Sequence, residues 1–290
     1  MFITPFTHHR PAGLHAVFDI LAKYGDDAAV YAGGTELLLA LKARVLRYEH
    51  LIDLKRVKEL GGVRVENDFI GIGALATHYR IANDPVVLAS IPEYASLSDG
   101  IANIRVRVAG TLAGNLSFAE PHSDPPALLA AMGATVQLVS ADSERSVPVS
   151  EFIAGEFTTM REDNELISEV RVPVTQPNEA FRFRSFGHLE RPAVNVAVGC
   201  KNDDGKTAFR IWLGAIGDHP IHAEKVETAL RGVPRASLRD VLPAATEEFT
   251  SGLSATSDLH GSADYKRHLA SVLMQRAVNE AAESASSKES

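Results

Sequence analysis

The sequence contains a single cysteine, Cys200, and this scarcity excludes several kinds of site. One thiol cannot form an internal disulfide, and one thiolate cannot hold an iron–sulfur cluster or a structural zinc ion, because each of these needs several ligands. Cys200 ends an apolar run that begins at Val194, so we expect a buried, unreactive thiol. Any metal redox centre that works with this chain must therefore lie on another chain.

Long apolar runs and basic surfaces are also missing. No run approaches the roughly 18 apolar residues that a membrane-spanning helix needs. The segment Met1–Pro5 lacks the basic and apolar regions of a secretory signal, so the cytoplasm is the expected compartment. A formal net charge of -8 without a basic stripe argues against nucleic-acid binding. The 290 residues, 45% of them hydrophobic, suffice for one large domain or two ordinary ones.

Hydrophobic periodicity predicts a compact unit of helices and strands at the start of the chain. Four apolar residues from Leu14 to Leu21 follow the i, i+3, i+4, i+7 spacing of a helix that Gly25 would end. The elements predicted after it are a strand at 28–32, a helix at 36–46 and a strand at 51–54.

Further along, the pattern predicts a second unit and then a separate domain. The expected elements are strands at 69–73, 134–140, 166–172, 181–186, 194–200 and 208–215, helices at 79–83, 125–132 and 263–282, and a hairpin turn at 202–205. The pattern relaxes around residues 173–178, where we place a domain boundary. The predicted domains are 1–175 (subdomains about 1–57 and 58–175) and 176–283, followed by a polar, disordered tail at 284–290.

The first motif is a glycine turn between a predicted strand and a helix. It reads Val30, Tyr31, Ala32, Gly33, Gly34, Thr35, Glu36 and Leu37. Backbone amides at such a turn can point at an anion, and glycine permits close approach of the backbone to a phosphate. An ordinary strand–helix turn would have the same pattern, so the motif alone leaves both readings open.

The second motif is another stretch of small residues, Thr111–Leu116, followed by the segment Glu120–Pro125. Asn115 and Asp124 in these segments can bind ribityl hydroxyls or the edge of a flavin. Two such turns, far apart in the sequence, suit a dinucleotide pyrophosphate gripped from both sides. Taken alone, this segment too could be an ordinary turn.

Three weaker patterns carry no function. The G-x-G-x-x-A pattern at 71–76 follows a strand but does not open a domain, and Pro85 would cut its helix short, so we do not expect a Rossmann site. The sequence at 205–207 looks like the end of a P-loop but lies in the predicted hairpin. The histidines at 8–9, 219 and 222 lack a third ligand, so no metal site is expected, and no nucleophile elbow is present.

Together, the segments Ala32–Thr35 and Thr111–Asn115 resemble the paired flavin motifs of the FAD-binding medium subunits of molybdenum hydroxylases. This is the family of xanthine dehydrogenase and aerobic carbon monoxide dehydrogenase. The likeness extends over nearly the whole chain in order and spacing, and it includes Gly73-Ala74-x-x-Thr77-His78, Ile104-Arg105, Ser123–Ala127, Leu166–Pro173, Leu213–Ala215 and Ala263–Arg267.

The resemblance implies a fold and a set of roles. The fold is an α+β, FAD-binding domain of two subdomains (PCMH/VAO type), followed by a smaller C-terminal α/β domain like that of carbon monoxide dehydrogenase flavoproteins. Residues 30–37 would wrap the pyrophosphate through backbone amides, and Thr77 and His78 would also belong to the cofactor site. The other implied cofactor-binding residues are Thr111, Gly114 and Asn115 on the opposite side of the pyrophosphate, Ser123 and Asp124 at the ribityl chain or flavin, Ile167 by the ring system, and Arg184 in place of a family lysine.

Two residues depart from the family pattern. Ala113 replaces the first of a pair of glycines, so that turn must accept a methyl group, and we expect weakened FAD binding. Pro192 stands in the stretch where carbon monoxide dehydrogenase flavoproteins carry a tyrosine against the flavin ring.

The resemblance also implies partners and an activity. The chain would be an oxidoreductase subunit that passes electrons through FAD from a [2Fe–2S] small subunit to an external acceptor. A molybdopterin large subunit would complete the complex, as a dimer of heterotrimers. No residue of the chain is expected to be catalytic. Two alternatives remain, a self-sufficient FAD-dependent oxidoreductase with the same flavin-binding fold and a flavin-free assembly scaffold.

Overall fold

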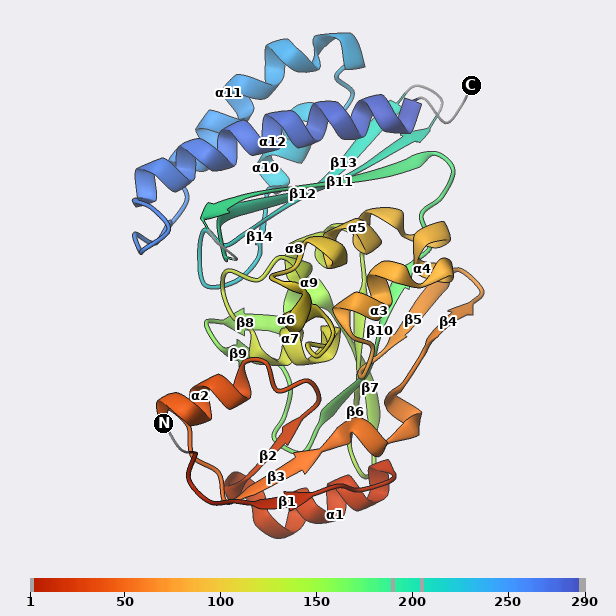
Figure 1. Ribbon diagram of the computed structural model, residues 1–290. Coiled ribbons are helices and arrows are strands. Elements are labelled where there is room, and N and C mark those ends of the chain that lie inside the picture. The colour runs from red at the N-terminus through yellow and green to blue at the C-terminus, as the bar shows by residue number, and fades with distance from the viewer. Residues whose placement is uncertain (1–2, 189–190, 204–205, 287–290) are drawn as a thin grey trace.

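The computed structural model describes residues 3–188, 191–203 and 206–286. The chain folds into three parts that follow one another along the sequence and along the length of the molecule (Figure 1). No helix of the described residues is both long and apolar enough to cross a membrane.

The N-terminal part is a small parallel sheet with strand order β1-β3-β2 and two helices. Its elements are β1 (Thr7–His9), α1 (Leu14–Tyr24), β2 (Ala28–Tyr31), α2 (Leu37–Ala43) and β3 (His50–Asp53). The predicted first helix is confirmed and ends at Gly25, where φ is +48°. Helix α2 is shorter than predicted because Arg44 takes a left-handed conformation. Strand β1 was not predicted, since three residues are too few to show an alternating pattern.

The middle part is an antiparallel sheet with strand order β4-β5-β10-β6-β7. Its strands are β4 (Val63–Glu66), β5 (Phe69–Gly73), β6 (Thr135–Val139), β7 (Glu144–Pro148) and β10 (Leu166–Pro173), with a separate pair β8 (Ile153–Gly155) and β9 (Thr158–Thr159). Its helices are α3 (His78–Asn83), α4 (Pro85–Ser90), α5 (Pro92–Gly100), α6 (Ile104–Arg107), α7 (Leu112–Phe118), α8 (Pro125–Ala131) and α9 (Val149–Phe152). The glycine pattern at 71–76 lies on an antiparallel strand, which a Rossmann site would not have.

The small-residue turn predicted at Thr111–Leu116 is mostly the first part of helix α7. Thr111 is its N-cap, and its hydroxyl accepts a hydrogen bond from the amide of Gly114 at 3.1 Å. Ala113, the departure from the family's paired glycines, is buried in the hydrophobic core with 6% exposure. The helical conformation accepts its methyl group because a helix has no need of positive φ there.

The C-terminal part is an antiparallel sheet with strand order β11-β12-β13-β14, covered by helices. Its elements are β11 (Glu179–His188), β12 (Arg191–Asp203), β13 (Lys206–Gly214), β14 (Ile221–His222), α10 (Glu224–Leu230), α11 (Leu238–Ser251) and α12 (Ala263–Ser286). The predicted hairpin is consistent with the pairing of Asp203 and Lys206, but residues 204–205 lie outside the described residues. Helix α12 includes residues 284–286, which were expected in the polar tail, and residues 287–290 lie outside the described residues.

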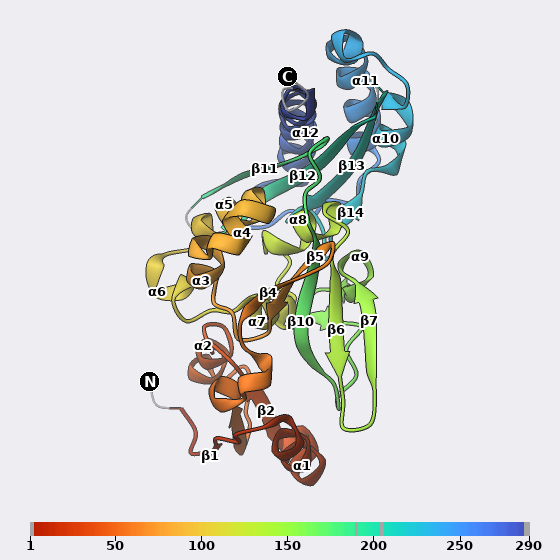
Figure 2. The same ribbon diagram turned by 90° about the vertical axis from the view of Figure 1, so that its right-hand side faces the viewer.

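Strand β12 is buried on both faces, which fixes how the C-terminal sheet sits on the rest of the molecule. Figure 2 shows the sheet between helices α11 and α12 on one side and helices α5 and α8 on the other. Val194, Val196 and Cys200 belong to the core beneath the C-terminal helices, whereas Ala197 belongs to the core of the middle part. Burial raises the pKa of the Cys200 thiol to about 12, as the prediction of an unreactive cysteine requires.

Candidate functional site

The glycine turn between β2 and α2 carries a row of unused backbone donors. Gly34 has φ +70°, a conformation that disfavours any residue with a side chain. Within the described part of the chain, the backbone amides of residues 33–37 donate to no carbonyl or side-chain oxygen. Successive free amides at a turn that opens a helix form a site for an anion such as a phosphate.

The two motifs that the sequence separates by about 75 residues meet in space. A Cβ atom added to Gly33 would lie 2.0 Å from the carbonyl oxygen of Ala109 and 2.9 Å from the Cα atom of Gly110. The hydroxyl of Thr35 would lie 3.3 Å from a Cβ added to Gly110. Gly33 is therefore required by the neighbouring backbone, and not only by the phosphate that its pattern suggested.

Thr77 and His78 fix the approach to the second motif. Thr77 and Thr111 form an isolated antiparallel bridge, in which the amide of His78 donates to the carbonyl of Gly110 at 3.0 Å. His78 is 2% exposed, and burial lowers its pKa to about 4, so the ring is neutral. Its Nδ1 atom is buried without a hydrogen-bond partner among the described residues. An unsatisfied buried polar atom behind the junction of the two turns fits a site that a polar ligand completes.

Asn115 and Ser123 also come together. The Ser123 hydroxyl donates to Asn115 Oδ1 at 2.7 Å, which ties helix α7 to the segment before helix α8. The Nδ2 group of Asn115 donates to no described residue. The second motif therefore has an amide donor, Asn115 Nδ2, that is free to bind a ligand.

Asp124 is held from the C-terminal domain. Its Oδ1 atom accepts hydrogen bonds from Asn195 Nδ2 at 2.9 Å and from the Ser185 hydroxyl at 3.4 Å. Burial raises the pKa of the Asp124 carboxyl to about 6, and the nearby Glu120 acts in the same direction, while the two hydrogen bonds oppose it. Sequence reasoning identified Asp124 but missed Asn195, because the two residues are 71 positions apart and no local pattern connects them.

Two further side chains, Lys55 and His8, lie at the first glycine turn. Lys55 Nζ donates to the carbonyl of Ala32 at 3.2 Å and lies 4.3 Å from the centre of the Tyr31 ring. His8 Nε2 lies 3.0 Å from the Tyr31 hydroxyl, whose pKa is raised by burial. Sequence reasoning missed Lys55, although its position directly after strand β3, next to β2 in the sheet, was a usable signal.

An ion-pair network joins the same turn to the C-terminal domain. Arg191, at the start of β12, lies 2.7 Å from Glu120 and 3.7 Å from Glu36, the residue after Thr35. His122 contacts Glu120 at 2.9 Å and Asp258 at 3.0 Å, and the hydrogen bond to Glu120 is the main cause that raises the pKa of His122. No local sequence pattern indicates this network.

Two predicted site residues lie apart from this group. Ile167 is 4% exposed on β10, within the hydrophobic core of the middle part. Arg184 makes an ion pair with Glu280 of helix α12. Because Arg184 and Ser185 are consecutive on β11, their side chains leave opposite faces of the sheet, and only Ser185 reaches Asp124. Val30 and Leu37 are half-buried at the two ends of the glycine turn.

The proline that replaces the family's tyrosine has a structural explanation. Pro192 is buried next to a register shift between β11 and β12, opposite Gly187. A Cβ atom on Gly187 would lie 2.4 Å from the Cα atom of Pro192. The irregular pairing accommodates a residue that cannot donate a backbone hydrogen bond.

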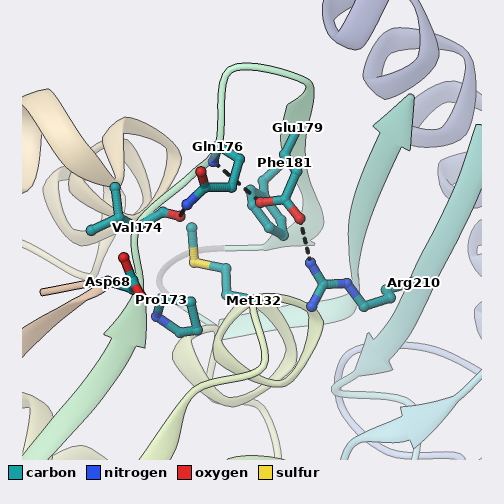
Figure 3. Close-up of a pocket in the computed structure, with 8 residues that line it drawn as sticks. All are labelled: Asp68, Met132, Pro173, Val174, Gln176, Glu179, Phe181 and Arg210. Atoms are coloured by element: carbon teal, nitrogen blue, oxygen red, sulfur yellow. Dashed lines mark hydrogen bonds and ion pairs between the residues drawn. The ribbon is translucent and has the colours of Figure 1, made fainter. Parts of the chain in front are cut away.

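A cavity of about 410 Å³ lies elsewhere, at the linker between β10 and β11 (Figure 3). Its lining consists of Asp68, Met132, Pro173, Val174, Gln176, Glu179, Phe181 and Arg210, so none of the predicted site residues contributes to it. We therefore do not assign the cofactor to it. Among the described residues, no group of three or more His, Cys, Asp or Glu side chains could hold a metal ion.

Free amides at a glycine turn, a second motif that begins beside this turn, and a carboxylate with an oxygen that has no described partner fit a ligand that combines a pyrophosphate with a polyol. FAD has both groups. The fold and the site thus define an α+β protein that binds a flavin dinucleotide.

Comparison with known proteins gives the family. Residues 4–175 match the family model described as "FAD binding domain in molybdopterin dehydrogenase", and residues 181–281 match the "CO dehydrogenase flavoprotein C-terminal domain". The chain belongs to this family of FAD-binding medium subunits of molybdenum hydroxylases. It is an oxidoreductase subunit, its cofactor is FAD, and the expected fold class is confirmed.

Individual relatives cover nearly all of the chain. The carbon monoxide dehydrogenase medium chain of Hydrogenophaga pseudoflava is 31% identical over 95% of this chain and 96% of its own length. The caffeine dehydrogenase subunit beta of Pseudomonas sp. strain CBB1 is 31% identical over 97% of this chain and 96% of its own length. A solved structure of carbon monoxide dehydrogenase from Hydrogenophaga pseudoflava matches with a TM-score of 0.93 and 31% identity, covering 98% of this chain and 99% of that one.

Proposed function

We propose that the chain passes electrons through FAD from a [2Fe–2S] small subunit to an external acceptor. A molybdopterin-containing large subunit would carry the substrate chemistry, and the complex would be a dimer of heterotrimers. The observation that carries this proposal is the combination of an FAD-binding domain with a single, buried cysteine. The relatives support it, because their names, medium chain and subunit beta, denote components of larger enzymes.

In this proposal the chain's own residues bind and orient the cofactor. The free amides of residues 33–37 would hold one side of the pyrophosphate, where five unused donors meet the ligand's negative charge. Thr111, Gly114 and Asn115 would close the other side, because helix α7 begins directly after Ala109 and Gly110, whose backbone lies against the glycine turn. Ser123 and Asp124 would orient the ribityl hydroxyls.

FAD supplies the ability to exchange electrons singly on one side and in pairs on the other. The contribution of the chain is to hold the cofactor in one orientation and to surround it with fixed charges. The neutral His78 adds no charge behind the two turns, whereas burial raises the pKa of the Asp124 carboxyl to about 6. No acid–base pair of this chain is required to touch an organic substrate.

The proposal is tested by mixing the FAD-loaded chain with a reduced [2Fe–2S] small subunit and recording the flavin absorbance in a stopped-flow instrument. We expect loss of the oxidised flavin band, followed by its return when an acceptor is added. A flavin that stays oxidised beside the reduced iron–sulfur subunit, although it is bleached by dithionite, would contradict the proposed route.

A further inference from the structure

Three residues form a straight row across the C-terminal sheet and meet the FAD-binding domain. Ser185 on β11 pairs with Asn195 on β12, and Asn195 pairs with Gly214 on β13. The hydroxyl of Ser185 and the amide of Asn195 both donate to Asp124 Oδ1. The row thus reaches from one domain into the predicted flavin site of the other.

The Asn195 side chain is held in place more tightly than that of Ser185, the other residue that donates to Asp124. It is fully buried, and its Nδ2 group also donates to the carbonyl of Ser123 at 3.3 Å. The third residue of the row, Gly214, leaves room for this side chain, because a Cβ atom there would lie 2.4 Å from Asn195 Oδ1 and would push the amide aside. The Asn195 amide therefore occupies the space above Gly214 that a larger side chain would fill.

The arrangement is costly for stability alone. Asn195 Oδ1 is buried without a hydrogen-bond partner among the described residues, and a buried unsatisfied acceptor is unfavourable. An apolar residue of the same shape would leave no such atom. The role of the amide is to orient the Asp124 carboxylate. It donates a hydrogen bond to Oδ1, and Oδ2 is left without a described partner.

We propose that Asn195 is a positioning residue for the flavin, which acts by fixing the Asp124 carboxylate so that Oδ2 is presented to the cofactor. The C-terminal domain is then part of the FAD site rather than a separate module. This inference rests on the proposed role of Asp124 in holding the ribityl hydroxyls.

The test is a double-mutant cycle on FAD affinity, measured by flavin fluorescence with the full-length chain after removal of FAD. We expect Asn195→Leu to weaken FAD binding about tenfold, in line with a lost hydrogen bond to a charged group. Asp124→Ala should weaken it at least as much, and adding Asn195→Leu to Asp124→Ala should cause no further loss. The visible circular dichroism of bound FAD should change in Asn195→Leu, as it reports the orientation of the flavin.

Asn202→Leu is the matched control, because Asn202 is a buried asparagine of the same strand whose Oδ1 is also unpartnered but which has no contact with Asp124. It should keep wild-type affinity and dichroism. Gly214→Ala provides a second route, since its methyl group would displace the Asn195 amide, and we expect a loss in the same direction.

The inference would be overturned if FAD affinity were unchanged in both Asn195→Leu and Gly214→Ala. It would also be overturned if Asn195→Leu weakened FAD binding as much in the Asp124→Ala background as in the wild-type chain. A wild-type chain that takes up no FAD would overturn the flavin site itself, and the inference with it. Wild-type FAD binding without electron transfer from the iron–sulfur subunit would contradict the proposed function alone.

Discussion

At the scale of single residues, the site depends on positions where a side chain is impossible. Gly33 leaves room for the backbone of Ala109, and Gly34 takes a positive φ that opens the amides of residues 33–37. The first requirement is a contact between segments far apart in sequence, and the second is local. Both make glycine necessary, but for different reasons.

We expect Gly33→Ala and Gly34→Val each to weaken FAD binding by about a hundredfold or more, because the first separates the two turns and the second forbids the turn conformation. Gly100→Ala is the matched control, since Gly100 is exposed with open space around its Cβ position. His219→Ala, at an exposed histidine that pairs with Asp218, should also bind FAD normally. Equal flavin content in Gly33→Ala and Gly100→Ala would contradict the site.

The pH dependence of FAD binding should report Asp124. In the protein without FAD, burial favours the neutral Asp124 carboxyl. The folding stability that this raised pKa contributes is therefore lost as pH rises from 3.8, the ordinary pKa of the group, through about 6. A hydroxyl donor from the cofactor favours the ionised carboxylate, so FAD affinity should increase as pH rises through about 6 and level off above it.

The measurement is the dissociation constant of FAD between pH 5 and 8, with Asp124→Asn as the comparison. The amide cannot titrate, so the variant should bind more weakly at pH 8 and lack the step near pH 6. An identical step in wild type and Asp124→Asn would assign the titration to another group, of which Glu120 and His122 are the charged neighbours.

Sequence reasoning at this scale could propose the glycines, the capping threonine and Asp124 as site residues, because each belongs to a continuous motif. It could not find Asn195 or Arg191, whose contacts arise only when a strand of the C-terminal domain lies beside the FAD-binding domain. The expected neighbourhood of Arg184 and the flavin stays a prediction, since the structure shows Arg184 paired with Glu280.

At the scale of elements, helix α12 and strand β12 connect the C-terminal domain to the site. Lys266 of α12 is fully buried, and its Nζ atom lies 2.6 Å from Asp258, which in turn contacts His122 beside the flavin motif. Although burial raises it, hydrogen bonds from Lys266, the His260 amide and His122 lower the pKa of Asp258 to about 2. This chain of contacts fixes the end of α12 against the FAD-binding domain.

We expect Lys266→Met to lower the free energy of unfolding by about 2 kcal/mol, because it leaves the partly buried Asp258 without its cation. The double variant Lys266→Met/Asp258→Asn should recover part of that loss. Lys225→Met, at an exposed lysine of α10, is the control and should change stability little. Denaturant unfolding measures all three, and equal stability of Lys266→Met and Lys225→Met would contradict this account.

Elements with a strong period were predictable, as α1, α12 and the strands β11 to β13 show. The sequence underestimated their lengths, because Ser284 and the ends of β11 are polar and gain their order from packing. Helix α7 was interpreted as a turn, since glycine and asparagine at 114–115 are weak helix formers, and the cap at Thr111 outweighs them.

At the scale of the whole molecule, the chain is an FAD-binding medium subunit of the molybdenum hydroxylase family. The matched family model gives FAD as the cofactor, and the relatives match over nearly the full length of the chain. The described residues contain no group of three or more metal-binding side chains, and the one cysteine is buried. These observations are consistent with the proposal that other subunits supply and accept the electrons.

The most direct test of this account is the rate of substrate-driven flavin reduction, measured for the isolated FAD-loaded chain and for the complex rebuilt with its iron–sulfur and molybdenum subunits. We predict that the substrate of the complex reduces the flavin only in the complex, while dithionite reduces it in both. If the isolated chain is reduced by that substrate as fast as the complex, the chain is a self-sufficient oxidoreductase and the subunit account is wrong.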